Sequence, residues 1–113
     1  MKTATNPLPK SMRGKHRYIS FSCEKKGIDG KALFRAFNDT MLFLFGASGT
    51  AQSGFSLVIF NEQTGKGAIK VDLGWEKKML PAFAFLSEKL GAGITSKKAS
   101  GTLITLKPWI ESH

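Results

Sequence analysis

The order of strand and helix patterns along this 113-residue chain predicts an α+β fold of the split βαβ type. Three observations lead to this prediction. An early alternating apolar pattern predicts a strand, two segments with apolar residues at helical spacing predict helices, and a short polar turn between two apolar runs predicts a hairpin. The resulting order is strand, helix, strand, strand, helix, strand, which gives a two-layer sandwich with two helices on one face of an antiparallel sheet.

The first strand and the first helix are predicted from two different periods. In residues 17–23, the side chains of Ile19, Phe21 and Cys23 alternate with Tyr18 and two serines, as expected for a strand with one buried face. Residues 31–45 have apolar side chains at helical spacing, and Gly46 is suited to end that helix. The core-facing positions predicted for it are Leu33, Phe34, Phe37, Met41, Leu44 and Phe45.

A hairpin is predicted next. Residues 55–61 are apolar on both faces, residues 61–66 form a polar turn, and residues 67–73 return as a strand with Ile69 and Val71 turned inward. Between the first helix and this hairpin lies a run of small residues, 46–54, which is predicted to be a connecting loop.

The last third of the chain is predicted to contain a second helix and two strand-like segments. The helix covers residues 76–90, although Pro81 indicates a start near Met79. Gly91 and Gly93 end this helix, and residues 94–98 and 101–107 are strand-like on either side of a bulge or tight turn. Its predicted core positions are Leu80, Phe83, Ala84 and Leu86.

Size and composition predict one domain. The chain divides into a basic arm at residues 1–16, a single sandwich at residues 17–107 and a short tail at residues 108–113. Its one cysteine, Cys23, excludes an internal disulfide, and no signal peptide or membrane span is expected, so we expect a cytoplasmic protein.

The positive charge is concentrated at two places. The formal net charge is +9, and residues 1–17 contain five lysines and arginines and no acidic residue. Residues 88–107 contain four lysines against one acid. A polyanionic partner such as RNA is the simplest explanation, because each neutralised phosphate releases condensed counterions. A basic soluble surface without a partner is the alternative.

Most of the candidate motifs for binding or catalysis lack the sequence context that their function requires. Residues 46–49 form a GxxG sequence, but in KH domains that clamp joins two helices, whereas a strand is expected here. The third strand lacks the aromatic side chains that an RNA-recognition motif uses for base stacking. His16, Cys23 and His113 do not have the spacing of a metal site, and the acidic residues do not form a pair suited to acid and base catalysis.

An ordered set of short sequences resembles one known family. These sequences are Leu8-Pro9, Arg13, Lys15, Arg17-Tyr18-Ile19, Leu44-Phe45-Gly46, Phe60-Asn61-x-x-Thr64-Gly65-x-Gly67 and Ser100-Gly101-Thr102. Over roughly residues 8–106, they resemble component 2, the small protein subunit of archaeal and eukaryotic ribonuclease P. The split βαβ order agrees with the RRM-like or ferredoxin-like fold.

The resemblance implies a role in removing 5′ leaders from precursor tRNA. In such enzymes the RNA subunit supplies the active site and binds catalytic Mg²⁺, so this chain would bind no cofactor and would not be catalytic by itself. It would brace the catalytic RNA while paired with a larger protein subunit in a heterodimer or heterotetramer, and it would meet precursor tRNA only indirectly.

Two sets of site residues follow from the charge and the resemblance. The predicted RNA-contacting residues are Lys10, Arg13, Lys15, Arg17, Lys97 and Lys98. The predicted partner-interface residues are Gly46, Ser48, Gly49, Gln52, Ser53 and Gly54. The chain has Lys70-Val71-Asp72 where the family often has a basic residue and cysteine, which shifts the expected RNA surface toward the arm and Lys97-Lys98.

Two other functions stay open at this point. The chain could be a small basic protein-assembly module, because the strand at residues 55–60 is apolar on both faces. It could also be a small acylphosphatase-like enzyme of the same topology, with an anion held by backbone amides of residues 46–54.

Overall fold

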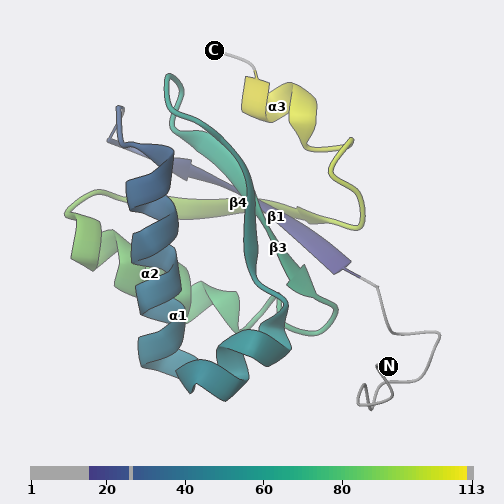
Figure 1. Cartoon of the computed structure of the whole chain (residues 1–113). Coiled ribbons are helices and arrows are strands. Elements are labelled where there is room, and N and C mark those ends of the chain that lie inside the picture. The colour runs from purple at the N-terminus through teal and green to yellow at the C-terminus, as the bar shows by residue number, and fades with distance from the viewer. Residues whose placement is uncertain (1–15, 26, 112–113) are drawn as a thin grey trace.

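The structure, a computed structural model, describes residues 16–25 and 27–111. Its elements are β1 (His16–Cys23), α1 (Gly30–Ser53), β2 (Ser56–Asn61), β3 (Lys66–Asp72), α2 (Met79–Leu90), β4 (Ile94–Ser100) and α3 (Lys107–Glu111). The four strands lie in the order β2-β3-β1-β4, and every neighbouring pair is antiparallel. Helices α1 and α2 pack on one face of this sheet (Figure 1), which confirms the split βαβ sandwich.

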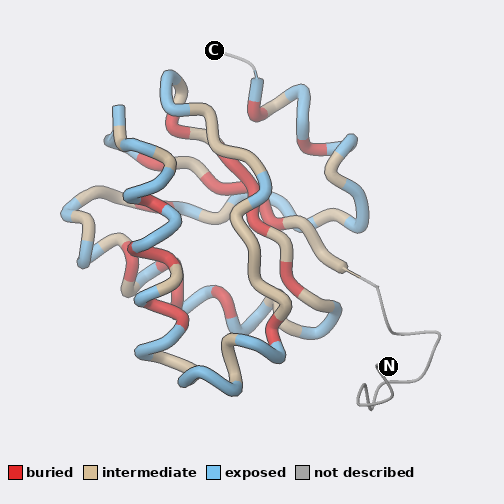
Figure 2. The backbone as a smooth tube through the Cα atoms, in the orientation of Figure 1, coloured by how far each residue is buried: buried red, intermediate tan, exposed pale blue. Residues whose placement is uncertain are grey.

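The main core lies between these two helices and the sheet (Figure 2). Phe21 of β1 is fully buried at its centre, with ring centroids 5.6 Å from Phe37 of α1 and 6.0 Å from Phe83 of α2. Ile69 and Val71 face inward from β3, as predicted. Alternation along β1 and β3 therefore places one apolar face of the sheet against the helices.

Helix α1 is longer than the sequence predicts. Residues 47–53 are helical, so the loop predicted at residues 46–54 was wrong. Gly46, with φ 73° and ψ 175°, interrupts the helical backbone for one residue but does not end α1, so the predicted helix end was wrong. The helix resumes after a kink that is visible in Figure 1. The true end is Gly54, whose φ of 64° is the left-handed geometry that favours glycine after a helix.

The predicted core faces of the helices need a correction. Leu80 is 58% exposed and Ala84 is also exposed, whereas Met79, Ala82, Phe83 and Leu86 are buried. Met79 and the positions three, four and seven residues later lie on the same side of the helix, and this is the side that packs in the main core. Leu80 and Ala84 lie roughly 110° and 150° around the axis from the centre of that side.

Helix α1 shows one similar error among its predicted core residues. Phe34 is 46% exposed, although Leu33, Phe37 and Met41 are fully buried as predicted. Phe34 instead stacks on Phe55, with ring centroids 6.4 Å apart. Ala36 and Thr40 complete the buried side of the helix.

The C-terminal segment does not form the strand predicted at residues 101–107. Strand β4 ends at Ser100, and the chain then turns onto the opposite face of the sheet and forms α3 (Figure 1). Leu106 and Ile110 pack there against Ala68 of β3. Apolar residues on the second face of the strands explain this turn, because Tyr18 and Ile59 also pack against this smaller cluster.

Gly65, in the β2–β3 hairpin, lies very close to the backbone of Cys23 in β1. Its φ is +75°, its carbonyl accepts a 2.7 Å hydrogen bond from Cys23 N, and an added methyl group would collide with the Cys23 carbonyl oxygen. We expect Gly65→Ala to lower the free energy of unfolding by about 2 kcal/mol or more, measured by urea denaturation.

Gly91 provides the matched control for this substitution. It has a similar φ of +66°, but an added methyl group there would meet no atom within 4 Å. Gly91→Ala should therefore cost only the left-handed backbone penalty of about 1 kcal/mol. Equal losses at both positions would show that the contact with Cys23 has no energetic effect.

Candidate nucleic-acid interface

The structure describes three of the six residues predicted to contact RNA. Lys10, Arg13 and Lys15 lie outside the described residues. Arg17 lies in β1, and its Nε is 3.3 Å from Glu76 Oε2, so its charge is partly compensated. Its guanidinium also lies beside Gly101, just after the end of β4.

Lys97 and Lys98 are exposed on β4, which is an edge strand of the sheet. The pairing of β4 with β1 shifts here, because Ser20 pairs with Lys98 while the next residue, Phe21, pairs with Ser96. Lys97 is therefore the additional residue of a β-bulge. A bulge interrupts the alternation of side chains between the two faces, and it presents two neighbouring lysines at one exposed place.

Ser20 holds this bulge in place. Its side chain is buried, its hydroxyl accepts a hydrogen bond of 3.0 Å from Lys98 N, and it lies 3.2 Å from the Lys98 carbonyl oxygen, to which it donates. Ser20 is thus a positioning residue for the exposed lysines. The sequence predicted only that Ser20 lies on the second face of the strand. Its contact with Lys98 could not be predicted, because 78 residues separate the two along the chain.

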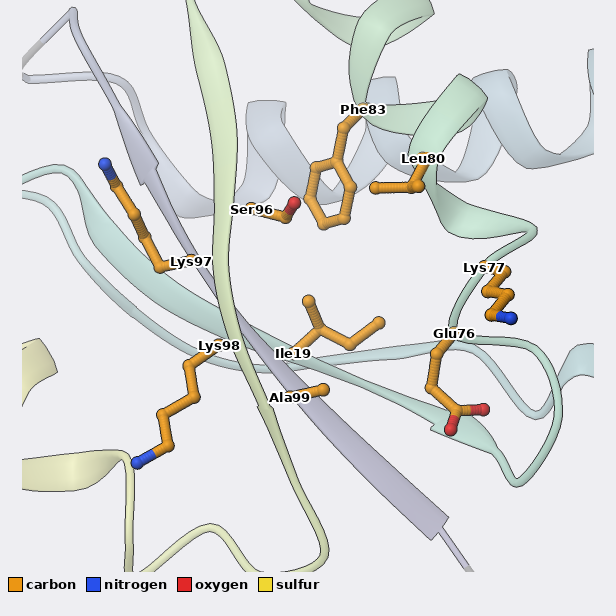
Figure 3. Close-up of a pocket in the computed structure, with 9 residues that line it drawn as sticks. All are labelled: Ile19, Glu76, Lys77, Leu80, Phe83, Ser96, Lys97, Lys98 and Ala99. Carbon is orange, nitrogen blue, oxygen red and sulfur yellow. The ribbon is translucent and has the colours of Figure 1, made fainter.

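A groove lies between β4 and the beginning of α2 (Figure 3). It has a volume of about 160 Å³. The lining residues are Ile19, Glu76, Lys77, Leu80, Phe83, Ser96, Lys97, Lys98 and Ala99. The groove therefore combines an apolar interior with a charged rim, next to the lysines of the bulge.

The second face of the sheet is partly covered. RNA-recognition motifs stack bases on aromatic side chains of that face. Here Leu106, Ile110 and the partly buried Leu103 pack over it, and Lys66 Nζ lies 4.9 Å from the centre of the Trp109 ring. This arrangement leaves the exposed edge at β4, rather than the covered face, as the better candidate for contact with RNA.

The residues predicted to contact a protein partner differ in exposure. Gly46, Ser48 and Gln52 are exposed, whereas Gly49 and Gly54 are half-buried. The Ser53 side chain is fully buried, and its hydroxyl donates to the Thr50 carbonyl oxygen at 2.6 Å and accepts from Phe55 N at 3.1 Å. Ser53 therefore secures the end of α1.

An exposed aromatic pair was not predicted from the sequence. Phe43 of α1 is 72% exposed and stacks on Phe85 of α2, with ring centroids 4.9 Å apart. The neighbouring Leu42 is also exposed. The available signal was that Phe43 does not fit the apolar period of α1, since an apolar residue off the core side of a helix must face solvent or a partner.

The described residues contain neither a metal-binding cluster nor a helix that could span a membrane. In residues 16–25 and 27–111, no group of three histidine, cysteine or acidic side chains is placed to hold a metal ion. None of the helices in the same part of the chain is both long and apolar enough to cross a membrane.

Comparison with known proteins identifies the family. The model of the Rpp14/Pop5 family matches residues 17–110, which extend from β1 into α3. The chain therefore belongs to the Rpp14/Pop5 family, a family of ribonuclease P protein subunits, and the resemblance found in the sequence is confirmed. No curated protein gives a significant match.

Proposed function

We propose that this member of the Rpp14/Pop5 family is an RNA-binding subunit of ribonuclease P that supports removal of 5′ leaders from precursor tRNA. Family membership over residues 17–110 is the observation that carries the proposal. In the proposed enzyme, the RNA subunit binds the catalytic Mg²⁺ and performs cleavage in the cytoplasm. This chain braces that RNA together with a larger protein subunit.

Electrostatics supports an RNA partner. The chain has a net charge of +9, and Lys97 and Lys98 are exposed at the bulge of β4 with no acidic partner among the described residues. Phosphates placed there would release counterions and gain favourable Coulomb energy. We assign the phosphate contacts to these lysines and Arg17, together with Lys10, Arg13 and Lys15 of the arm.

The protein partner is a separate part of the proposal. We assign contact with the larger subunit to the exposed Gly46 at the kink of α1 and to Ser48 and Gln52, two of the exposed residues of the helical part that follows it. Half-buried Gly49 and Gly54 would belong to the same interface, although their missing side chains leave room for Phe45 and Asp72 of this chain. Ser53 would act by holding the helix end rather than by direct contact.

Reconstitution tests the function directly. Precursor tRNA cleavage by a ribonuclease P RNA should be measured at low Mg²⁺, with the larger protein subunit present and with or without this chain. We expect cleavage to depend on the chain, because a basic subunit lowers the Mg²⁺ needed to neutralise the RNA. Absence of any rescue, together with absence of binding to that RNA, would overturn the proposal.

Salt dependence tests the two lysines of the bulge. Lys97→Ala/Lys98→Ala should reduce the slope of log K against log salt by about two, because each lost phosphate contact removes close to one unit. Binding to the same RNA would be measured by fluorescence anisotropy over a range of KCl concentrations.

A second double variant controls for net charge. Lys31→Ala/Lys89→Ala removes the same charge from exposed positions on α1 and α2. Its slope should stay close to that of the unaltered protein. An equal effect of both double variants would mean that only the total charge matters and that β4 has no specific contact with phosphate.

A further inference from the structure

The groove between β4 and α2 has an apolar interior that is open to solvent. Figure 3 shows Leu80, Phe83 and Ser96 turned toward the space between these elements, with Ile19 and Ala99 below them. Leu80 is 58% exposed and supplies accessible apolar surface to the groove, whereas Phe83 is held in the core by Phe21 and Phe37. An apolar surface that is left open in this way favours contact with an apolar group of a ligand, such as the face of an aromatic ring.

The rim of the groove is positively charged. Lys77 lies on the α2 side, while Lys97 and Lys98 extend from the other side of β4 (Figure 3). The single acid of the lining, Glu76, is already engaged by Arg17 Nε at 3.3 Å and by Gly74 N at 2.6 Å. Because that carboxylate is compensated, the exposed Lys77 gives the α2 side of the groove a positive charge. The exposed Lys97 and Lys98 extend away from the groove in Figure 3 and add positive charge on the outer side of β4.

Ser96 adds a polar group to the interior. Its hydroxyl is directed into the groove in Figure 3 and makes no hydrogen bond to another described residue. A hydroxyl both donates and accepts, so it suits the edge of a heterocyclic base. Apolar walls, one free hydroxyl and a rim of lysines together match a nucleotide, with its base in the groove and its phosphates outside.

A peptide strand added to the edge of β4 is the competing occupant. Edge strands that accept another strand are flat and regular, whereas bulges and lysines are the features that prevent such pairing. β4 has both features at the point where a peptide would pair, since the register shifts between Ser20 and Phe21 opposite Lys97 and Lys98. The same lysines attract phosphate, so the observations favour RNA.

We propose that this groove binds one unpaired nucleotide of a single-stranded RNA segment. The base lies against Leu80 and Ala99 with its edge at Ser96, and the flanking phosphates lie near Lys77 on one side and near Lys97 and Lys98 on the other. The inference rests on the proposed RNA-binding function and adds to it a preference for single strands. A duplex keeps its bases stacked and would reach only the lysines.

Affinities of the full chain for a short single-stranded RNA oligonucleotide and for an RNA duplex of the same length provide the test. Leu80→Gln removes the apolar wall while keeping a good helix former on an exposed position. We expect it to weaken single-strand binding by about fivefold or more, as loss of one base contact does, with duplex binding unchanged.

Two further variants sharpen the test. Ala99→Leu keeps the surface apolar but fills the groove, so it should also weaken binding of the single strand. Leu42→Gln is the matched control, because Leu42 is an exposed leucine on α1 that does not line the groove. It should leave both affinities unchanged.

The contrary outcomes separate this inference from the proposed function. If Leu80→Gln has no effect while Lys97→Ala/Lys98→Ala weakens both RNAs, the nucleotide site is wrong and RNA binding stands. If Leu80→Gln weakens only assembly with the larger protein subunit, the groove is a protein-docking site and the inference is overturned. If the unaltered chain binds neither RNA at low salt, both the proposed function and the inference fail.

Discussion

Replacing Phe21 with alanine is expected to lower the free energy of unfolding by about 3–5 kcal/mol, as for other buried aromatic residues. Phe21 is fully buried and is in ring contact with Phe37, Phe83 and Phe60. Its removal leaves a cavity where β1, β2, α1 and α2 meet, so no single element can move in to fill it. Small domains have about 5–15 kcal/mol of stability in total, so urea denaturation should show a large loss.

Phe43→Ala is the control for aromatic removal. Phe43 is 72% exposed and its ring contact is with Phe85 on the helix surface. Its loss should cost no more than the about 0.5–1.5 kcal/mol typical of an aromatic pair. A similar loss of stability for the two variants would contradict the assignment of Phe21 to the centre of the core.

The fold could be predicted because the periodic signals are strong. Strand β1 was placed to within one residue, the β2–β3 hairpin was found from its polar turn, and α2 begins at Met79, where Pro81 indicated. In each case the local conformational preference of the residues and the burial of their apolar side chains favour the same secondary structure. The buried faces of β1 and β3 therefore followed from alternation alone.

The errors arose where packing decides between two local possibilities. Residues 47–53 are small and include Gly49, so their sequence resembles a loop. Their helix is supported by contacts that the sequence does not display, such as the buried hydroxyl of Ser53 at its end. Residues 101–107 resemble a strand, but β4 is an edge strand, and among the described residues no further strand extends the sheet beyond it.

The candidate site was predicted in part. Exposed Lys97 and Lys98 were expected from charge, but their bulge depends on the distant Ser20, and the groove depends on Leu80. Leu80 was predicted to be buried, because Leu80, Phe83 and Ala84 also have the i, i+3, i+4 spacing of one helix face. The structure instead buries the side that contains Met79, Ala82, Phe83 and Leu86. The error concealed the exposed apolar wall on which the inferred nucleotide site depends.

Replacing Ile110 with aspartate should release α3 from the sheet. Ile110 is fully buried in the small cluster with Leu106 and Ala68, and an unpaired carboxylate there would lose its hydration. We expect a loss of about 2–5 kcal/mol in the stability of the docked helix, in the range of other buried isoleucine substitutions. Hydrogen exchange should show faster exchange at the amides of residues 106–111.

The loss should be local, because the main core between α1, α2 and the sheet does not include this cluster. Slow exchange in β1 and β3 should therefore persist. Ile104→Asp is the matched control, since Ile104 belongs to the same segment but is 80% exposed, and it should leave α3 docked. Equal exchange in both variants would show that Ile110 does not hold the helix.

The same pair of variants also distinguishes the two faces of the sheet as RNA surfaces. Both add one negative charge near the C-terminus, so a general electrostatic effect on RNA affinity should be similar in both. If RNA is bound at the edge of β4, as proposed, undocking of α3 in Ile110→Asp should cause no further change. A marked gain in RNA affinity in that variant alone would instead mean that α3 covers an RNA-binding surface around Tyr18 and Lys70, and the assignment to β4 would then be wrong.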